Sequence, residues 1–384
     1  MRFIAALFVF LAHIAIENLW DDPEVNESMT LTVNRLGWVG VGFFFILSGF
    51  VLTWSARPKD TVRAFWRRRL MKVYPNHLVT LVIGALLLLW TGQALNLGNT
   101  VPGALLIQSW FPSPNVFSST NRPAWSLACE ALFYLSFPLL HRLILRIPRN
   151  RLWAWTAGVL AAVVLVPVCV QLFVPDRPLA PWADIPLRHF YVVYNLPPVR
   201  MLDFTLGILL ARLVRTGKWL PVRLSAAIPL LGVSLVVLMF VPAIYGMLAV
   251  TVVPLMMVIA AGAQADVNGT RSPFRGRVMI WLGEVSFAFY MVHDLVLHYG
   301  HRLIGAEKTW STPGAIGISV LFAVASLFFA WLLYTLVERP AMTRWGRSSR
   351  PAKEPRPEPA EVRVPPVGDL IPPQAEREKT AVDR

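Results

Sequence analysis

The chain has 384 residues, of which 55% are hydrophobic and only 15% are charged, and its mean hydropathy is +0.54. A soluble domain normally carries about 25% charged residues, so this composition excludes an ordinary water-soluble fold. The formal net charge is +14, but the basic residues are dispersed between apolar runs, which disfavours a nucleic-acid partner. The composition therefore indicates a polytopic membrane protein.

Ten apolar runs along the chain predict an all-α integral membrane protein with about ten transmembrane helices. Several runs are close to the ~20 residues that a helix needs to cross a bilayer. They cover 3–20, 36–56, 74–92, 125–145, 152–174, 198–213, 222–241, 246–264, 278–298 and 314–337. The first run has no small-residue cleavage site, so we do not interpret it as a removable signal peptide.

The basic residues between these runs are divided unequally between the two sides of the membrane. Nineteen Lys and Arg residues fall on the side that includes Arg2, and seven fall on the other side. The positive-inside rule then predicts that both termini are cytoplasmic. After Trp345, prolines alternate with charged residues and the apolar periodicity ends. We therefore expect a transmembrane domain over 1–345 and a disordered, Pro-rich, charged cytoplasmic tail over 346–384.

The first apolar run, RFIAALFVFLAH, contains two polar groups, Arg2 and His13. Eleven helical residues at about 100° each bring both side chains to one face, roughly 16 Å apart along the axis. Arg2 then lies at one membrane surface and His13 near the midplane, which predicts a reaction axis. The alternative is that Arg2 is a positive-inside anchor and His13 a hydrogen-bonded packing residue.

Seven strings occur in a fixed order over about 340 residues of the chain. They are RFIAALFVFLAH, GVGFFFILSGFVL, FWRRRLMKVYP, PAWSLACEALFYLSFPLL, RMLDFTLGILLARL, GEVSFAFYMVHDLVL and LVERP. Together they resemble the acyltransferase-3 family of bacterial membrane O-acyltransferases. The resemblance departs from the family pattern at Lys72, where Arg is common. It also departs at the start, because several residues usually precede the arginine that is Arg2 here.

The resemblance implies transfer of an acetyl or other short acyl group from acyl-CoA, with acetyl-CoA as the expected donor. The acceptor would be a hydroxyl of a sugar, a glycan or a macrolide-type natural product. It also implies a multi-pass protein of the bacterial plasma membrane that needs no metal. Two other hypotheses stay open: an exporter or flippase of a lipid-linked sugar, which predicts paired half-repeats that we do not find, and a non-catalytic scaffold.

Transfer to a hydroxyl needs a base, and His13 is the candidate general base because its ordinary pKa lies near neutral pH. Glu130 lies about 7 Å inside the fourth predicted helix if Trp125 marks the boundary, which is within plausible reach of the level of His13. We therefore expect Glu130 to orient the imidazole and stabilise its protonated form. The alternative for Glu130 is a capping interaction with Ser126, although the spacing is one residue too long for that motif.

The phosphates of a CoA donor need cations at the cytoplasmic surface. Arg2 and the predicted basic loop, with Arg67, Arg68, Arg69 and Lys72, supply them, and arginine suits bidentate phosphate contacts. The alternative is a generic positive-inside cluster beside anionic lipid.

Four further residues are candidates for lining the site. Ser48, beside Gly49, predicts either close helix packing or part of an acyl tunnel. Trp125 and Ser126 join the donor-side set by the resemblance alone, since tryptophan is also common at membrane interfaces. His293, followed by Asp294, is an acceptor-side candidate, with a hydrogen-bonded packing role as the alternative. The sequence does not predict the oligomeric state, the acyl length or the acceptor.

Overall fold

The structure is a computed structural model and describes residues 1–57, 60–270 and 273–345. Each of the ten predicted apolar runs overlaps one of the ten longest helices in this part of the chain. These helices are α1 Arg2–Ile14, α3 Leu36–Trp54, α4 Val62–Trp90, α7 Trp125–Leu145, α8 Leu152–Phe173, α10 Pro197–Arg215, α11 Leu224–Phe240, α13 Val252–Val267, α14 Arg277–Gly305 and α15 Thr312–Leu333. The expected tail over 346–384 lies outside the described residues.

Short elements connect these helices. The short α-helices are α2 Pro23–Thr32, α5 Leu97–Ala104, α6 Pro114–Phe117, α9 Leu187–Phe190, α12 Ala243–Gly246 and α16 Arg339–Arg344. The 3₁₀ turns are η1 Val33–Arg35, η2 Gln108–Trp110, η3 Arg122–Ala124, η4 Arg149–Arg151 and η6 Pro273–Arg275, and the π-helical segments are η5 Tyr191–Asn195 and η7 Tyr334–Glu338. Strands β1 Leu179–Ala180 and β2 Ala183–Pro186 form one antiparallel hairpin.

One boundary differs from the prediction in a way that matters for the site. The basic segment expected as a loop before residue 74 is the first part of α4, which begins at Val62 after Thr61 caps Ala64 N. Arginine and lysine are good helix formers, so the helix continues past the apolar run into the basic segment. Residues 69 and 72 therefore stand one helical turn apart on a common face.

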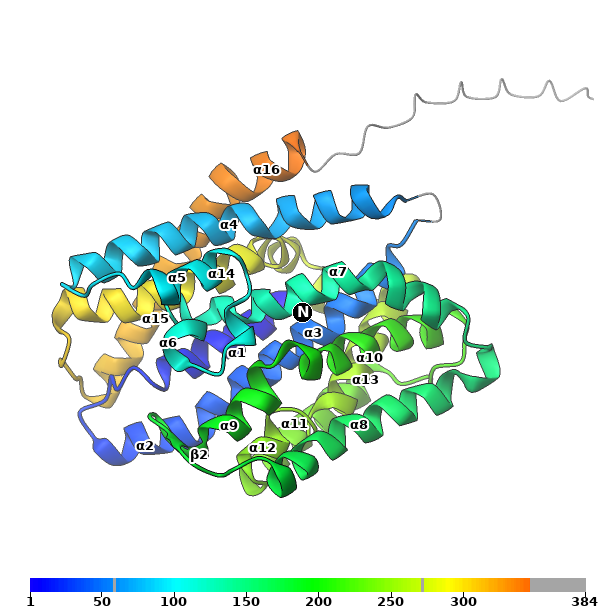
Figure 1. Ribbon diagram of the computed structural model, residues 1–384, viewed down its shortest axis with the longest axis horizontal. Coiled ribbons are helices and arrows are strands. Elements are labelled where there is room, and N and C mark those ends of the chain that lie inside the picture. The colour runs from blue at the N-terminus through cyan, green and yellow to red at the C-terminus, as the bar shows by residue number, and fades with distance from the viewer. Residues whose placement is uncertain (58–59, 271–272, 346–384) are drawn as a thin grey trace, which may run out of the picture. The chain divides into compact units, whose positions relative to one another are not determined.

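The chain is an all-α membrane protein. Six helical segments of the described chain are long and apolar enough to cross a bilayer, and α1, α11 and α13 are shorter apolar helices. Figure 1 shows the long helices lying side by side. Many large apolar side chains point outward, such as Leu165 and Leu172 on α8 and Val324 on α15, which are 55%, 70% and 61% exposed. Such exposure suits lipid contact and would be costly in water.

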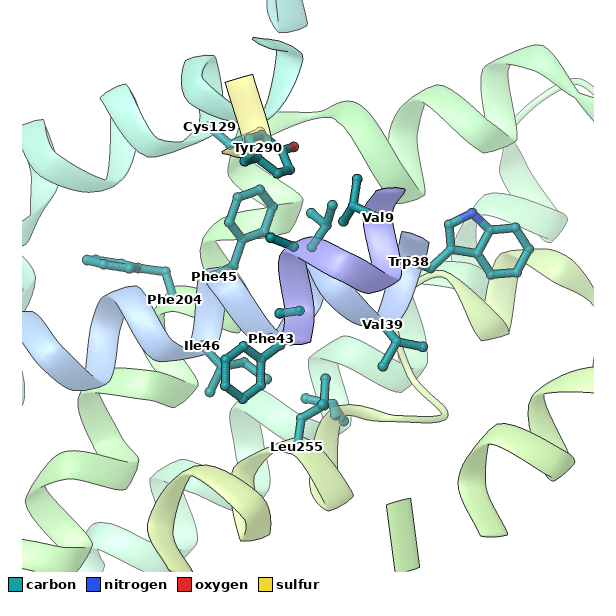
Figure 2. Close-up of a cluster of buried hydrophobic side chains, with 14 of the residues drawn as sticks. Val9, Trp38, Val39, Phe43, Phe45, Ile46, Cys129, Phe204, Leu255 and Tyr290 are labelled. Carbon is teal, nitrogen blue, oxygen red and sulfur yellow. The ribbon is translucent and has the colours of Figure 1, made fainter. Parts of the chain in front are cut away.

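Helix α3 lies at the centre of the bundle and packs against α1, α10 and α13. Figure 2 shows side chains from these helices, including Val9, Phe45 and Phe204, meeting in one apolar cluster. The contact with α10 is close because Gly49 and Gly207 face the partner backbone. A Cβ at Gly49 would clash with the Phe204 carbonyl, and one at Gly207 would clash with the Ile46 carbonyl. Gly49 therefore has the close-packing role that small residues take between membrane helices.

Helix α10 carries a buried ion pair that fixes it inside the bundle. The Arg200 guanidinium is fully buried, lies 2.7 Å from Asp203 Oδ2 and donates to the Met247 carbonyl at 3.1 Å. Its charge also lies over the rings of Phe45 and Tyr194, at 5.2 and 5.7 Å. Charged residues within a membrane face the bundle interior and find partners there. This pair thereby holds α3, α10 and Tyr194 together beside the site.

Candidate active site

Two hollows lie at opposite ends of α1. The first, here called the cationic cavity, has a volume of about 120 Å³ and includes Arg2 in its lining. The second, here called the histidine cleft, has a volume of about 1100 Å³ and includes His13 in its lining. Val41 and Tyr290 line both hollows, so the two hollows share part of their wall. The two ends of the predicted axis therefore open into adjacent spaces.

The cationic cavity gathers most of the residues predicted for the donor side. Its lining includes Arg2 from α1, Ser48 from α3, Arg69 and Lys72 from α4, and Ser126 and Glu130 from α7. The Arg69 Nε is buried and has no hydrogen-bond partner among the described residues. An unpaired buried donor of this kind is costly unless a ligand satisfies it. The cavity is thus chemically suited to an anionic ligand.

Two of the basic residues are held by carboxylates of this chain. Lys72 Nζ donates to Glu338 Oε1 at 2.7 Å, and Asn76 Nδ2 donates to Glu338 Oε2, also at 2.7 Å. Glu338 is fully buried at the end of η7, and its two hydrogen bonds fix the position of Lys72 and Asn76 on α4. Arg68 instead pairs with Asp60 and does not appear in the cavity lining. Of the predicted cations of α4, only Arg69 and Lys72 reach the cavity.

The predicted partnership of Glu130 with His13 is not what the structure shows. Glu130 Oε2 accepts a hydrogen bond from Tyr134 Oη at 2.8 Å, one turn along α7. Its carboxylate lies in the cationic cavity with Arg2, Arg69 and Lys72, whereas His13 lines the other hollow. The number of residues along a helix does not fix the direction in which a side chain points. Trp125, also predicted on the donor side, lines the histidine cleft.

His13 forms a direct pair with His293 of α14. His13 Nδ1 lies 2.8 Å from His293 Nε2, and the two rings stack with centroids 5.0 Å apart. His293 Nδ1 faces two backbone carbonyls, those of Tyr290 at 2.8 Å and Phe289 at 3.2 Å. A carbonyl can only accept, so His293 Nδ1 carries the hydrogen and, in the neutral ring, Nε2 accepts. His13 must then donate from Nδ1, which leaves His13 Nε2 as the unprotonated, basic nitrogen.

A chain of charges continues from this pair. Asp294 Oδ1 lies 3.7 Å from His13 Nδ1 and forms an ion pair with Arg122 Nη2 at 2.7 Å. Asp294 Oδ2 accepts a hydrogen bond from Arg122 Nε at 3.0 Å. Arg122 also donates to Glu17 Oε1 at 2.6 Å, and His298 lies 3.6 Å from Glu17 Oε2. A carboxylate beside an imidazole stabilises the protonated ring. Asp294 thus occupies the position beside His13 that was predicted for Glu130.

Glu17 remains ionised in this chain. Burial raises the pKa of Glu17, but the hydrogen bond from His298 and the nearby charge of Arg122 outweigh that effect and bring the pKa below its ordinary value. The sequence prediction did not single out Glu17 or Arg122. Glu17 lies within the apolar run 3–20, and an acidic residue in such a run was the available signal; α1 itself ends at Ile14. Nothing local pointed to Arg122.

Comparison with known proteins assigns the chain to a family. A family model described as an acyltransferase domain matches residues 1–335. The chain belongs to the acyltransferase-3 family. It is 42% identical over 366 residues to the acyltransferase MdmB of Streptomyces mycarofaciens, covering 93% of this chain and 94% of that protein. It is 22% identical over 331 residues to the peptidoglycan O-acetyltransferase OatA of Listeria monocytogenes, covering 77% of this chain but only 50% of OatA. No solved structure matches the chain significantly.

The protein is an O-acyltransferase, which decides against the exporter and scaffold hypotheses. Its reaction requires an acyl donor and an acceptor. The two adjacent hollows provide separate spaces of different chemistry, one cationic and one with a basic imidazole nitrogen in its lining.

Proposed function

We propose that this acyltransferase moves an acetyl or other short acyl group from acyl-CoA in the cationic cavity to a hydroxyl of a sugar, glycan or macrolide-type acceptor in the histidine cleft. The observation that carries this proposal is the shared wall of the two hollows. Val41 and Tyr290 line both, so a thioester on one side and a hydroxyl on the other are neighbours. Holding two reactants in this way removes most of the entropic cost of their encounter.

The residues of the cationic cavity fit a CoA thioester. Arg2 and the unpaired Arg69 Nε supply donors for phosphate, while Lys72 contributes a charge that Glu338 already balances in part. A volume of about 120 Å³ does not hold the whole donor. We place its acyl and thioester end inside the cavity and its phosphates at the mouth, where the donors of Arg2 and of the basic face of α4 would bind them.

His13 is the general base in this proposal, and Asp294 and His293 position it. His13 Nε2 takes the proton of the acceptor hydroxyl as the oxygen attacks the thioester carbonyl. The carbon–sulfur bond then breaks, and the imidazolium returns the proton to the departing thiolate, so that the ester and free CoA leave. Asp294, 3.7 Å from His13 Nδ1, stabilises the imidazolium between these two proton transfers.

The topology belongs to the same proposal. We propose that the ten helices that overlap the apolar runs cross the bilayer of the bacterial plasma membrane with both termini in the cytoplasm, because the basic residues favour that side by nineteen to seven. The cationic cavity then opens toward the cytoplasm, where acyl-CoA is made, and the histidine cleft toward the outer side. Residues 1–345 form the catalytic domain, and 346–384 are dispensable for catalysis.

Deleting the gene and profiling O-acyl groups by mass spectrometry would test the function. We expect an acyl ester to disappear from a surface glycan or a secreted glycosylated metabolite, and to return when the wild-type protein is expressed but not when His13→Ala is expressed. An unchanged O-acyl profile in the deletion strain, together with no acyl-CoA consumption by the purified protein, would refute the proposal.

A further inference from the structure

The histidine cleft has one continuous aromatic wall. Four ring contacts link five side chains in sequence: Phe117 to Trp182 at 6.5 Å, Trp182 to Phe190 at 5.5 Å, Phe190 to Tyr194 at 5.3 Å, and Tyr194 to Trp125 at 4.7 Å between centroids. All five line the cleft. From Trp182, which is 45% exposed, the wall leads inward to Trp125, which is 8% exposed, and on the other side of Trp182 it ends at Phe117, which is 4% exposed. It therefore leads from solvent into the interior.

The backbone that carries this wall is unusual. Trp182 is in the two-residue connection of the β1–β2 hairpin, and Tyr194 is in the π-helical segment η5. Single turns of π-helix are rare and often occur at functional sites. The segment also ends in Asn195, which presents an amide beside Tyr194. Two special local structures thus meet along one wall of the cleft.

Asn195 provides an independent sign of a ligand. Its residue is 1% exposed, it lines the cleft, and its Oδ1 has no hydrogen-bond partner among the described residues. A buried acceptor without a partner is costly. A hydroxyl donated by a bound molecule would satisfy it.

The charges of the cleft favour a neutral molecule. Arg122 is engaged by Asp294 and Glu17, and Arg35 donates to the carbonyls of Leu238 and Val241. Asp184 adds one carboxylate to the lining, and most of the other polar side chains are uncharged amides and hydroxyls, such as those at 18, 34, 96, 99 and 118. An anionic acceptor would find no cation here that is free of a protein partner.

We infer that the aromatic wall and Asn195 form the acceptor site of the enzyme, and that this site takes a neutral glycoside of two or more rings. Sugar rings present flat apolar C–H faces to aromatic rings and hydroxyls to amides, which matches both features. The volume of about 1100 Å³ is at the upper end of small-molecule sites, so one sugar ring would not fill it. This inference rests on the proposed function, which assigns the acceptor hydroxyl to the histidine cleft.

Binding of defined glycosides to the purified protein in lipid nanodiscs tests the inference without an acyl donor. The neutral probe is 4-nitrophenyl maltoside, the charged probe is 4-nitrophenyl glucuronide, and Kd is measured by calorimetry. We expect Trp182→Ala to raise the Kd for the maltoside about 10-fold or more, as loss of an aromatic anchor does. Trp182→Phe should stay within a few-fold, because a ring face remains. Trp155→Ala, which removes a lipid-facing tryptophan 55% exposed on α8, is the matched control and should not change the Kd.

Asn195 is tested in the same assay. Asn195→Ala should raise the Kd for the maltoside about 5- to 10-fold, as expected for one lost hydrogen bond to a buried acceptor. It should not alter the Kd for acetyl-CoA. Maltotriose and hexyl maltoside then distinguish two classes of acceptor. Tighter binding of maltotriose indicates that the acceptor is the end of a glycan, and tighter binding of hexyl maltoside indicates that it is a glycosylated apolar molecule.

Three results would overturn the inference. They are no binding of the maltoside to the wild-type protein, an equal Kd for Trp182→Ala and Trp155→Ala, or glucuronide binding as tight as maltoside binding. Failure of the proposed function is distinguishable, because it is an absence of acyl transfer by the wild-type protein and leaves glycoside binding unaffected.

Discussion

Replacement of His293 tests whether the histidine pair sets the tautomer of His13. Gln at position 293 can place a carbonyl oxygen near the site of His293 Nε2, so it can still accept from His13 Nδ1, but it cannot carry a proton. Leu removes the acceptor altogether. We therefore expect His293→Gln to keep much of the acyl-transfer rate and His293→Leu to lose it.

The size of the loss follows from the geometry. The bond between His13 Nδ1 and His293 Nε2 is 2.8 Å long. The donor is His13, whose side chain is 19% exposed. The cost of a buried donor without its acceptor, about 1–3 kcal/mol, is therefore an upper bound and corresponds to at most roughly 5- to 150-fold in rate if it falls on the reactive form of His13. His293→Gln should stay within a few-fold of the wild-type kcat, and neither variant should change the KM for acyl-CoA.

Steady-state kinetics on matched nanodisc preparations would measure these rates, with His141→Gln as the control. His141 stacks on Phe137 of α7 and lines neither hollow. If His293→Gln were as slow as His293→Leu, His293 would itself carry a proton in the reaction. If His293→Leu were as fast as the wild type, the pair would have no part in catalysis.

The other predictions concern the donor side, the tail and the topology. Arg69→Ala should raise the KM for acyl-CoA about 10-fold, and Lys72→Arg should leave it unchanged, because both residues are proposed to bind phosphate rather than to transfer protons. An equal KM for Arg69→Ala and the wild type would show that the basic face of α4 determines only the topology. Deleting the residues after Arg350 should leave membrane insertion and transfer intact, since a Pro-rich charged segment cannot bury a core, and loss of transfer at normal protein level would make the segment a docking element. Reporter fusions after Arg149 should read as cytoplasmic and fusions within 95–122 as external; the reverse pattern would overturn the ten-span topology.

The sequence predicted the helices well because apolar runs in a membrane protein report directly on burial in lipid. The predicted start of α4 was wrong because hydropathy reports on burial in lipid and not on helix formation itself. Hydropathy ends at the last apolar residue, whereas helix formation depends on backbone propensity, which Arg and Lys favour. Thus the helix begins at Val62 rather than near 74.

The site was predicted in part, and the limit is physical. The spacing of Arg2 and His13 follows from helix geometry alone, and the two residues do line neighbouring hollows. Glu130 lines the cationic cavity with Arg2 and accepts from Tyr134 rather than reaching His13, because the direction of a side chain depends on the neighbours against which its helix packs. The pairing of His13 with His293 joins residues 280 positions apart, and only the packing of α1 against α14 creates it.

The central claim is that His13 is the base between a donor in the cationic cavity and an acceptor in the histidine cleft. The most direct measurement is the acyl-transfer rate of His13→Ala, with acyl-CoA affinity measured on the same preparation. The account predicts a rate about 10²- to 10⁴-fold below that of the wild type. It also predicts an unchanged affinity for acyl-CoA, because His13 does not line the cationic cavity. A wild-type rate in His13→Ala would contradict it.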